Sequence, residues 1–302
     1  MIVITGPTGN IGRHLLSLLL ESAPAAGEEL RVIVRDPRRL PEAARGRVEV
    51  VVGSHGDADV LDRAFDGADA VFWLVPPDAS RSPQETWSAF SRPAVNAFDM
   101  HGVGHVVGVS ALGRGTALAD RAGLVSASLA MDDLIGESGV AYRALANPSF
   151  FENLLEEVDS IREKGVFLDC VDGDRKTPMV AVADIAAAAA SLLLDRSWRG
   201  VGSVPVLGPE DLSPNDLARV MSEQLGRPVR YERESFDAVY STLVGYGLHE
   251  EFVRGIVEMK QAKEDGLDAG VARTAETASP TSFEQWCAET LKPAFFAAVE
   301  AS

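Results

Sequence analysis

Short apolar segments alternate with amphipathic segments along the first half of the chain. The apolar segments span residues 1–4, 30–34, 48–52, 70–75, 105–110 and 140–145. Their apolar residues are consecutive, which is typical of strands buried on both faces of a parallel sheet. The segments 13–20, 57–65, 83–101 and 126–138 predict helices between them. This order predicts an α/β fold with a doubly wound parallel sheet and right-handed crossovers.

After about residue 150 the pattern is less regular. It predicts helices over 150–164, 185–194 and 213–225, an apolar run over 179–183, strands over 204–207 and 229–231, and mainly helix over 235–302. Asp184 and Ser213 stand where the N-caps of two of these helices are expected, and Pro93 is expected to kink the earlier helix over 83–101. We expect a sheet-containing domain over 1–150, to which about 178–200 returns, and a smaller helix-rich domain over 151–302, interleaved with it.

Composition and charge narrow the class of protein. Acidic residues outnumber basic ones by 45 to 28, for a formal net charge of −17. This charge argues against nucleic-acid or anionic-membrane partners, so we expect a small-molecule substrate and leave open whether the chain forms a homodimer. The run over 15–20 is too short to cross a bilayer, and Met1 already belongs to the first strand, which leaves no signal peptide. Two distant cysteines predict no disulfide and a cytoplasmic location, and five histidines without ligand spacing predict no metal site.

A glycine-rich turn joins the first strand to the first helix. The sequence TGPTGNIG places Gly6, Gly9 and Gly12 three residues apart. Gly6 permits a tight turn, Gly9 lets the backbone approach a pyrophosphate, and Gly12 lets the helix pack closely on the strand. The N-terminus of the helix then offers N–H groups and a positive dipole end to phosphates. We therefore predict a dinucleotide site here. Its remaining predicted contacts are Thr8, Asn10 and Ile11.

The end of the second strand predicts which dinucleotide is bound. In a Rossmann fold this end meets the adenosine ribose, where an acidic residue favours NAD and an arginine favours NADP. Arg35 holds that position, and Arg38 and Arg39 follow it. We therefore predict that NADP(H) is preferred and that NAD(H) is possible. Asp36 could instead repel the 2′-phosphate or bind a ribose hydroxyl, and a solvated basic turn is the alternative.

Together these segments resemble the NmrA-like family of atypical short-chain dehydrogenase/reductases. The similar segments include TGPTGNIG, VIVRDP, VVGVSALG and SGVAYRALANPSFFENL, and the resemblance covers nearly the whole chain. It implies a Rossmann fold, with NAD(P) bound by residues 1–150 and a substrate side in 151–302. The family includes reductases of quinones and other small organic molecules, as well as proteins that bind the dinucleotide and regulate transcription without turnover.

Further contacts follow from position and from this resemblance. Ser54 and His55 follow the third strand, where family members contact adenine, and an exposed turn is the alternative for His55. After the fourth strand, Leu74, Val75 and Pro76 are expected under the ribose and pyrophosphate. The segment Asn147, Pro148, Ser149 is similar to the family's Arg-Pro-Gly segment at the nicotinamide end, although Asn replaces Arg. Phe150, Phe151 and Asn153 are expected to line the substrate pocket, with core packing as the alternative for the phenylalanines.

The usual catalytic pair of short-chain dehydrogenases is absent. None of the four tyrosines has a lysine four positions later, so a lysine-activated phenol is not predicted. Ser110, at the end of the fifth strand, matches the serine that orients a substrate carbonyl and is the catalytic candidate, with a cofactor contact as well. Ser128 is a substrate-pocket candidate. It could share a helix face with Asp132, although a polar helix surface is the alternative.

These observations predict an NADPH-dependent oxidoreductase that reduces a small quinone-like, aromatic or carbonyl compound. Quinone reduction needs little acid assistance, which suits a chain without the tyrosine–lysine pair. The alternative is a noncatalytic NADP(H)-binding redox sensor or regulator.

Overall fold

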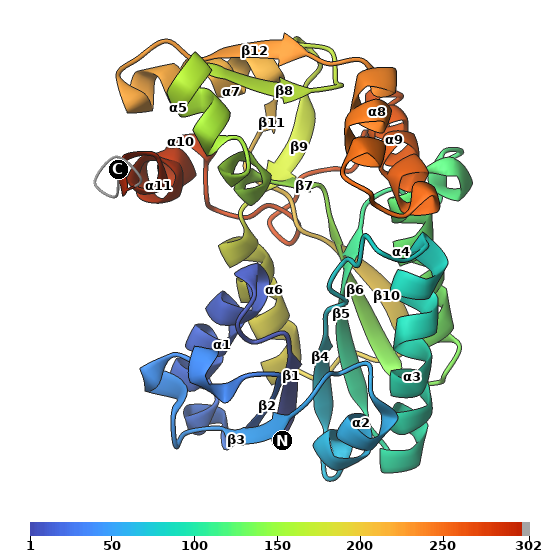
Figure 1. The fold of residues 1–302 in the computed structure, drawn as a ribbon. Helices are drawn as coiled ribbons and strands as arrows, with labels where there is room; N and C mark the ends of the chain where they lie inside the picture. Colours follow the sequence, from blue (N-terminus) through green and yellow to red (C-terminus); the bar gives the residue numbers. More distant parts are fainter. Residues whose placement is uncertain (298–302) are drawn as a thin grey trace. The chain divides into compact units, whose positions relative to one another are not determined.

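The computed structural model describes residues 1–297 (Figure 1). The last five residues of the helix-rich domain expected over 151–302 lie outside this range. The chain forms two compact units, each assembled from three segments. Unit 1 comprises Met1–Ala111, Ser126–Ala146 and Ile185–Val204. Unit 2 comprises Leu112–Val125, Asn147–Asp184 and Pro205–Ser302, the last described up to residue 297.

A seven-stranded sheet forms the centre of unit 1, in the order β10-β6-β5-β4-β1-β2-β3. The strands are β1 Ile2–Thr5, β2 Leu30–Val34, β3 Glu49–Val52, β4 Ala70–Trp73, β5 His105–Ala111, β6 Ala141–Asn147 and β10 Val201–Pro205. β1 pairs in parallel with both β2 and β4, and β2–β3 and β4–β5 are also parallel. The strand order reverses beside β1, where open α/β sheets bind ligands at the carboxyl ends of their strands. The predicted doubly wound Rossmann sheet is confirmed.

Helices cover both faces of this sheet (Figure 1). They are α1 Asn10–Ser22, α2 Ala58–Phe65, α3 Phe90–His101, α4 Leu124–Gly136 and α6 Val182–Leu194. All four residues of β1 are buried, as expected of a central strand. The helix expected over 83–101 begins with a π-helical turn, Glu85–Ala89. Pro93 lies one turn further on and has no N–H to donate to Ala89, the last residue of that turn.

Unit 2 contains two small sheets and most of the remaining helices. Its strands are β7 Ser149–Phe150, β8 Val166–Asp169, β9 Thr177–Val180, β11 Asp211–Leu212 and β12 Arg230–Arg233. Its helices are α5 Val158–Lys164, α7 Pro214–Leu225, α8 Phe236–Gly245, α9 Glu250–Glu264, α10 Phe283–Trp286 and α11 Lys292–Ala297, with a π-helical turn Cys287–Leu291. Phe151, Phe283 and Trp286 form the aromatic centre of its core.

Two local predictions for unit 2 differ in outcome. Ser213 is the N-cap of α7, and it forms a capping box with Asp216, as predicted. Asp184 is not the N-cap of α6, because that helix begins two residues earlier, at Val182. The Val182 N–H instead donates to the Glu152 carboxylate at 3.0 Å, while Asp184 accepts hydrogen bonds from Thr281.

The helix predicted over 150–164 is also wrong in its first half. Ser149 and Phe150 are extended and pair with Met179 and Val180 of β9. Their backbone is thus committed to a sheet, and a 3₁₀ segment, Phe151–Leu155, comes between it and α5. The apolar run carries no local signal for this pairing, since its partner lies about thirty residues later in the chain.

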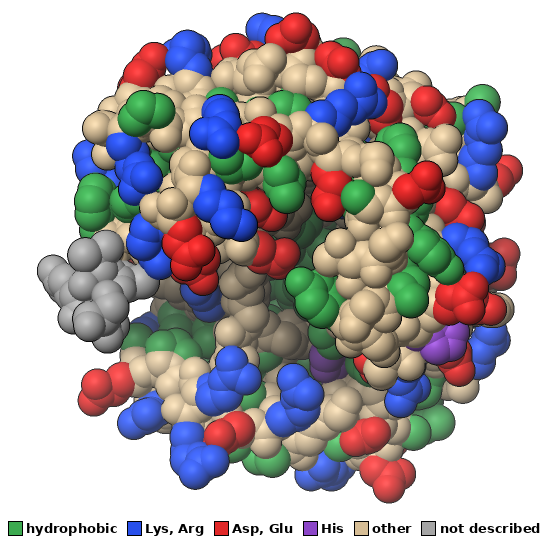
Figure 2. Space-filling view, turned by 45° about the horizontal axis from the view of Figure 1, so that its top comes forward, with side chains coloured by type: hydrophobic (Ala, Val, Ile, Leu, Met, Phe, Trp, Pro, Cys, Tyr) green, Lys and Arg blue, Asp and Glu red, His purple; other side chains and the backbone are tan. Residues whose placement is uncertain are grey.

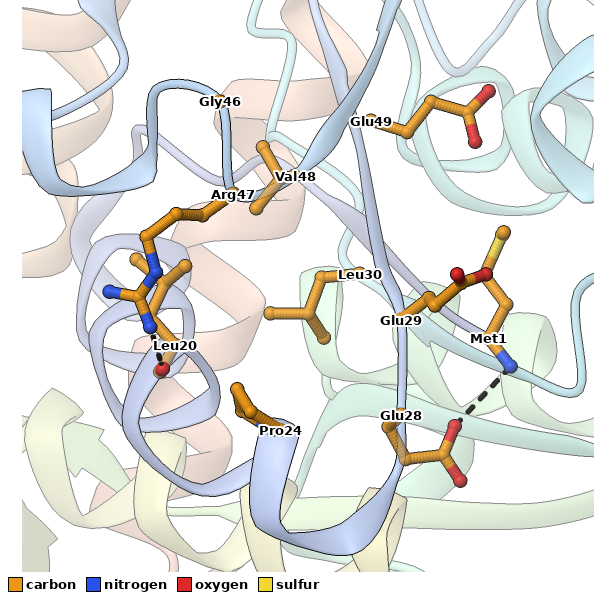
Figure 3. A pocket seen from close by; sticks show the side chains of 10 residues that line it. All are labelled: Met1, Leu20, Pro24, Glu28, Glu29, Leu30, Gly46, Arg47, Val48 and Glu49. Carbon is orange, nitrogen blue, oxygen red and sulfur yellow. Dashed lines mark hydrogen bonds and ion pairs between the residues drawn. The ribbon is translucent and has the colours of Figure 1, made fainter.

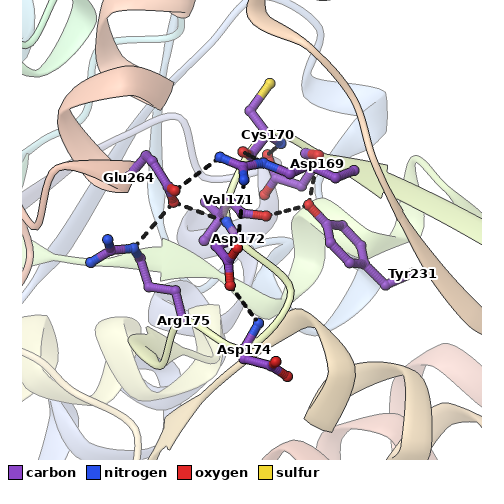
Figure 4. A network of polar contacts seen from close by, with 9 residues as sticks. Asp169, Cys170, Val171, Asp172, Asp174, Arg175, Tyr231 and Glu264 are labelled. Atoms are coloured by element: carbon purple, nitrogen blue, oxygen red, sulfur yellow. Dashed lines mark hydrogen bonds and ion pairs between the residues drawn. The ribbon is translucent and has the colours of Figure 1, made fainter.

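A polar network ties the loop after β8 to α9 within unit 2 (Figure 4). Glu264 accepts hydrogen bonds from Arg175 at 3.1 Å, from Arg233 at 2.9 Å and from the Asp172 N–H at 2.9 Å. The Tyr231 hydroxyl donates to the carbonyl oxygen of Asp169 at 2.7 Å. Burial is the largest cause that raises the pKa of Tyr231, so this phenol stays neutral. The network is a structural clamp built on one carboxylate.

Charged side chains of both signs are interspersed on the face seen in Figure 2, with no broad basic patch there. No helix within the described part of the chain is both long and apolar enough to cross a membrane. Both cysteines, Cys170 and Cys287, are unpaired and buried.

Candidate functional site

The glycine-rich turn after β1 has the geometry that its sequence predicts. Gly6 has φ +59°, a conformation that favours glycine. The Gly9 N–H donates to the Gly6 carbonyl at 3.1 Å, and Gly9 is the N-cap of α1. A Cβ on Gly12 would stand 2.0 Å from the Gly6 oxygen. Gly6 and Gly12 are therefore required by the fold itself.

Gly9 differs from its two neighbours in the motif. Its φ of −84° suits any residue, and an added Cβ would stand 3.4 Å from the Gly6 oxygen, an ordinary contact. The residue is exposed, so nothing in the described protein fills the space beside it. The fold would tolerate a side chain at this position, whereas a phosphate lying against the backbone would not. The position fits the predicted pyrophosphate.

The first turn of α1 is prepared for an anion. No acidic residue lies in this turn and no side chain caps it. Within residues 1–297, the N–H groups of Asn10, Ile11 and Gly12 have no backbone acceptor, because helical bonding starts with Arg13 donating to Gly9 at 3.0 Å. Thr8 is half-buried beside them. Free amides at the positive end of a 13-residue helix are an arrangement suited to a phosphate group.

Thr5 connects the glycine turn to the loop after β4. Its buried hydroxyl donates to the Phe72 carbonyl at 2.9 Å and accepts from the Leu74 N–H at 2.9 Å. Leu74 also contacts the turn, since a Cβ on Gly6 would lie 3.5 Å from its side chain. This bond fixes the direction of the loop Leu74–Val75–Pro76, in which Val75 is buried and Pro76 exposed. The structure thus brings this loop beside the turn.

His55 joins the same arrangement from the end of β3. Its Nε2 lies 2.9 Å from the Leu74 carbonyl oxygen, and its ring packs edge-on against Trp73 and Phe90. Burial lowers the pKa of His55 to about 4, so the ring is neutral near pH 7. The Nε2–H then donates to Leu74, which leaves Nδ1 as an acceptor. His55 is therefore half-buried and packed against aromatic rings, which does not match the alternative of an exposed turn histidine. The neighbouring Ser54 hydroxyl accepts a hydrogen bond from the Gly56 N–H at 3.1 Å.

Asp36 forms its hydrogen bonds within the basic turn that follows β2. Its carboxylate accepts two hydrogen bonds from the Arg38 guanidinium, each 2.9 Å long, and one from the Arg38 N–H. The Arg38 hydrogen bonds lower the pKa of Asp36, which is already committed within its own turn. Arg35 and Arg39 are exposed, and neither side chain has a hydrogen bond or ion pair within residues 1–297. Arg35 is available to an anion.

Ser110, Asp132 and Tyr142 form a buried cluster in unit 1. The Ser110 hydroxyl lies 2.5 Å from Asp132 Oδ2, and the Tyr142 hydroxyl lies 2.6 Å from Asp132 Oδ1. Ser128, one helical turn before Asp132, lies 3.4 Å from Ser110. Ser128 and Asp132 are 6% and 3% exposed, so the polar-surface alternative for this pair is wrong. Residue spacing had placed them on one face of a helix, and that face points to the sheet.

The residues predicted at the nicotinamide end and the substrate pocket belong to unit 2. Asn147 and Pro148 are buried, Ser149 and Phe150 are half-buried, and Asn153 is exposed. The Asn147 carbonyl accepts from the Leu112 N–H at 3.0 Å. Phe151 is 1% exposed and packs on Phe283 and Trp286. Core packing accounts for Phe151, whereas the pocket roles of Phe150 and Asn153 remain predictions.

Two cavities of unit 1 lie away from these residues. One, of about 430 Å³, is at the amino ends of β1, β2 and β3 (Figure 3), opposite the edge where such sheets bind ligands. Its lining includes Met1, whose amino group lies 3.3 Å from Glu28, and Arg47, which donates to the Leu20 carbonyl. The other, of about 550 Å³, is a groove between α2 and α3. In the described part of the chain, no group of three metal-ligating side chains is found.

Comparisons with known proteins agree with this geometry. A family model described as NAD(P)H-binding matches residues 6–196, and a model of the NmrA-like family matches residues 148–287. The chain is 30% identical over 96% of its length to (4-alkanoyl-5-oxo-2,5-dihydrofuran-3-yl)methyl phosphate reductase of Streptomyces griseus, covering 97% of that protein. It is 27% identical over 89% of both chains to quinone oxidoreductase 2 of Escherichia coli.

A solved structure supports the fold independently. The triphenylmethane reductase of Citrobacter sp., crystallised with NADP(H), has a TM-score of 0.78 to this chain. The two are 22% identical, over 94% of this chain and 98% of that one. A parallel sheet with a glycine-rich turn at its switch point is the arrangement of dinucleotide-binding proteins. The chain belongs to the NAD(P)H-binding, NmrA-like family.

Sequence reasoning missed two residues of the site. Thr5 was treated only as the first residue of the glycine-rich turn, although a hydroxyl at a strand end beside such a turn is a signal for this link. Tyr142 was considered only as half of a tyrosine–lysine pair. Its position on β6, whose neighbour in the sheet is β5, is what brings it to Asp132.

Proposed function

We propose that this protein is an NADPH-dependent oxidoreductase that reduces a small quinone-like, aromatic or carbonyl-bearing compound. The observation that carries the cofactor half of the proposal is Gly9, a glycine that its own fold does not require, beside three free amides. A pyrophosphate would lie against Gly9 and accept hydrogen bonds from Asn10, Ile11 and Gly12.

The preference for NADPH rests on the turn after β2. Asp36 is engaged by Arg38, so it is not free to bind a ribose hydroxyl. Arg35 is exposed and uncommitted, and it would pair with the 2′-phosphate. At the other end of the adenosine, Nδ1 of the neutral His55 would accept a hydrogen bond from the adenine amino group, next to Ser54. The loop Leu74–Val75–Pro76, fixed by Thr5, would pass under the ribose.

The reductase half rests on the position of Ser110 and on the relatives. Bound NADPH supplies a hydride. Ser110 is near the carboxyl end of β5, where open α/β sheets bind their ligands, and it would form a hydrogen bond to a substrate oxygen. We propose that the glycine turn and the strand ends of unit 1 bind the dinucleotide. The nicotinamide contacts predicted for Asn147, Pro148 and Ser149 and the substrate-side roles predicted for Phe150 and Asn153, all residues of unit 2, belong to the same proposal. A cytoplasmic location and the absence of a nucleic-acid partner belong to the same proposal.

The second candidate is a noncatalytic NADP(H) sensor. The missing tyrosine–lysine pair favours it, because binding without turnover needs no such pair. Calorimetry with NADPH and NADH comes first, followed by NADPH oxidation with benzoquinones, naphthoquinones, a triphenylmethane dye and an acylfuranone phosphate. Turnover of any of these supports the reductase. Tight NADPH binding without turnover of any of them favours the sensor, and the absence of NADPH binding contradicts both.

A further inference from the structure

The cluster of Ser110, Asp132 and Tyr142 adds a buried carboxyl group and a phenol to the serine that is proposed to orient the substrate. Its members come from β5, α4 and β6 and all belong to unit 1. They are 6%, 3% and 0% exposed. A carboxyl group with so little exposure resists ionisation, because burial penalises the charged form. The two hydroxyl groups on its oxygens act in the opposite direction, since they stabilise the carboxylate.

The protonation state of Asp132 decides what Ser110 can offer to a ligand. A serine hydroxyl has one hydrogen. When Asp132 is ionised, that hydrogen lies on the 2.5 Å bond to Oδ2, and Ser110 can only accept a hydrogen bond from a ligand. When Asp132 is protonated, its O–H donates to Ser110 Oγ. The Ser110 hydroxyl no longer donates to Asp132 and can donate its hydrogen to a ligand oxygen.

We propose that Asp132 holds the proton that the reduction consumes, and that Ser110 relays it to the substrate; this inference rests on the reductase function proposed above. Bound NADPH would supply the hydride, and the substrate oxygen would then carry the negative charge that a proton must neutralise. The Ser110 proton moves to that oxygen as the Asp132 proton moves to Ser110 Oγ. The products are the reduced substrate, the oxidised nicotinamide and an ionised Asp132, which regains its proton from solvent.

In this arrangement Asp132 acts through Ser110, and Tyr142 sets when Asp132 gives up its proton. Ser110 of β5 and Tyr142 of β6 contact the carboxyl. Ser128, one turn earlier on α4, lies 3.4 Å from Ser110, and Asp133 follows Asp132 along the same helix. The Tyr142 hydroxyl donates to Oδ1 at 2.6 Å. Its removal would favour the protonated form of Asp132 and shift its titration to higher pH.

The decisive variant is Asp132→Asn. Its amide can donate to Ser110 and accept from Tyr142, so the hydrogen-bond pattern of the protonated acid persists without a transferable proton. We expect kcat to fall about 100-fold or more, with KM little changed and the pH dependence of kcat lost. Asp133→Asn, the same change at the exposed neighbour, is the matched control and should retain the wild-type pH profile.

A second readout needs neither cofactor nor turnover. Infrared difference spectra of the cofactor-free protein, recorded as a function of pH, should show a carboxylic-acid C=O band that disappears as the pH is raised. The band should be missing in Asp132→Asn and should titrate at higher pH in Tyr142→Phe. A wild-type pH profile in Asp132→Asn, or a wild-type protein without this band, would overturn the relay. If instead the proposed reductase function were wrong, the wild-type protein would show the band but would turn over no substrate.

Discussion

Gly12 lies against Gly6 so closely that a Cβ on Gly12 would stand 2.0 Å from the Gly6 carbonyl oxygen. The atoms in the way belong to the backbone, which cannot move without opening the turn. Gly9, between them, has no such neighbour: an added Cβ would stand at an ordinary 3.4 Å from the same oxygen. The fold therefore requires glycine at position 12 of this motif, whereas it would accept a side chain at position 9.

Alanine substitutions should test this difference. Gly12→Ala should lower the free energy of unfolding by about 1–3 kcal/mol, because the backbone atoms that the added methyl group meets cannot move without opening the turn. Gly9→Ala should change stability by less than about 1 kcal/mol, yet weaken NADPH binding about 10-fold or more by placing a methyl group against the pyrophosphate. Urea unfolding and calorimetry measure the two effects. Undiminished NADPH affinity in Gly9→Ala would remove the phosphate from this turn.

Arg35→Ala should weaken NADPH binding far more than NADH binding. The guanidinium is exposed and uncommitted, and a charge-assisted contact to a phosphate contributes about 1.5–3 kcal/mol. We therefore expect about a 10- to 100-fold loss of NADPH affinity and little change for NADH, measured by calorimetry at one fixed salt concentration.

Arg38→Ala is the informative comparison for Arg35→Ala. Arg38 is tied to Asp36 by two hydrogen bonds, so its removal should release the carboxylate beside the 2′-phosphate and raise relative NADH affinity. Equal losses for both dinucleotides in Arg35→Ala would contradict the assignment of Arg35.

The sheet and its switch point follow from the sequence because consecutive apolar residues and glycine turns are local signals. The strand 30–34 is found with the predicted bounds, and Ser213 caps its helix. Short strands such as β7 and β11 contain two residues each and are defined by partners distant in the chain. No local pattern specifies them, which is why the predicted helix over 150–164 begins at Phe150, a residue of β7.

The candidate site likewise contains some residues with a local sequence signal and others that only the tertiary structure identifies. Gly6, Gly9 and Gly12 are recognisable from spacing alone. The partnership of Asp132 with Tyr142 depends on which way α4 faces and on which strand neighbours β5, and both are tertiary facts. Likewise, the sequence leaves open that Asp36 binds a ribose hydroxyl, and only the structure shows that its carboxylate is bonded to Arg38.

His55 should make stability depend on pH. Its pKa is lowered from 6.5 to about 4 in the folded protein, so the unfolded chain binds more protons between these values. Stability is therefore full above about pH 6.5 and falls as the pH approaches 4, by up to about 3 kcal/mol. His55→Gln should flatten this part of the profile in urea unfolding. His249→Gln, at an exposed histidine, should not, and identical slopes in wild type and His55→Gln would contradict the account.

Glu152 is the polar centre of unit 2, and a double-mutant cycle can test how it works. One carboxylate oxygen accepts from the Trp286 indole N–H at 2.9 Å and the other accepts from the Val182 N–H at 3.0 Å. Glu152→Gln keeps the shape but provides only one oxygen for two donors. One buried donor then faces an N–H group, which should cost about 1–3 kcal/mol.

Trp286→Phe removes one of the two donors and should therefore change the cost of Glu152→Gln. In the Trp286→Phe background the amide can turn its oxygen to Val182, so the same substitution should cost about 1 kcal/mol less than in the wild type. Urea unfolding of the four proteins, followed by circular dichroism, gives this coupling. If the two substitutions were additive, the oxygens of Glu152 would not be divided between the indole and the start of α6. A coupling of the expected sign would mean that this carboxylate supplies the capping function that the sequence assigned to Asp184.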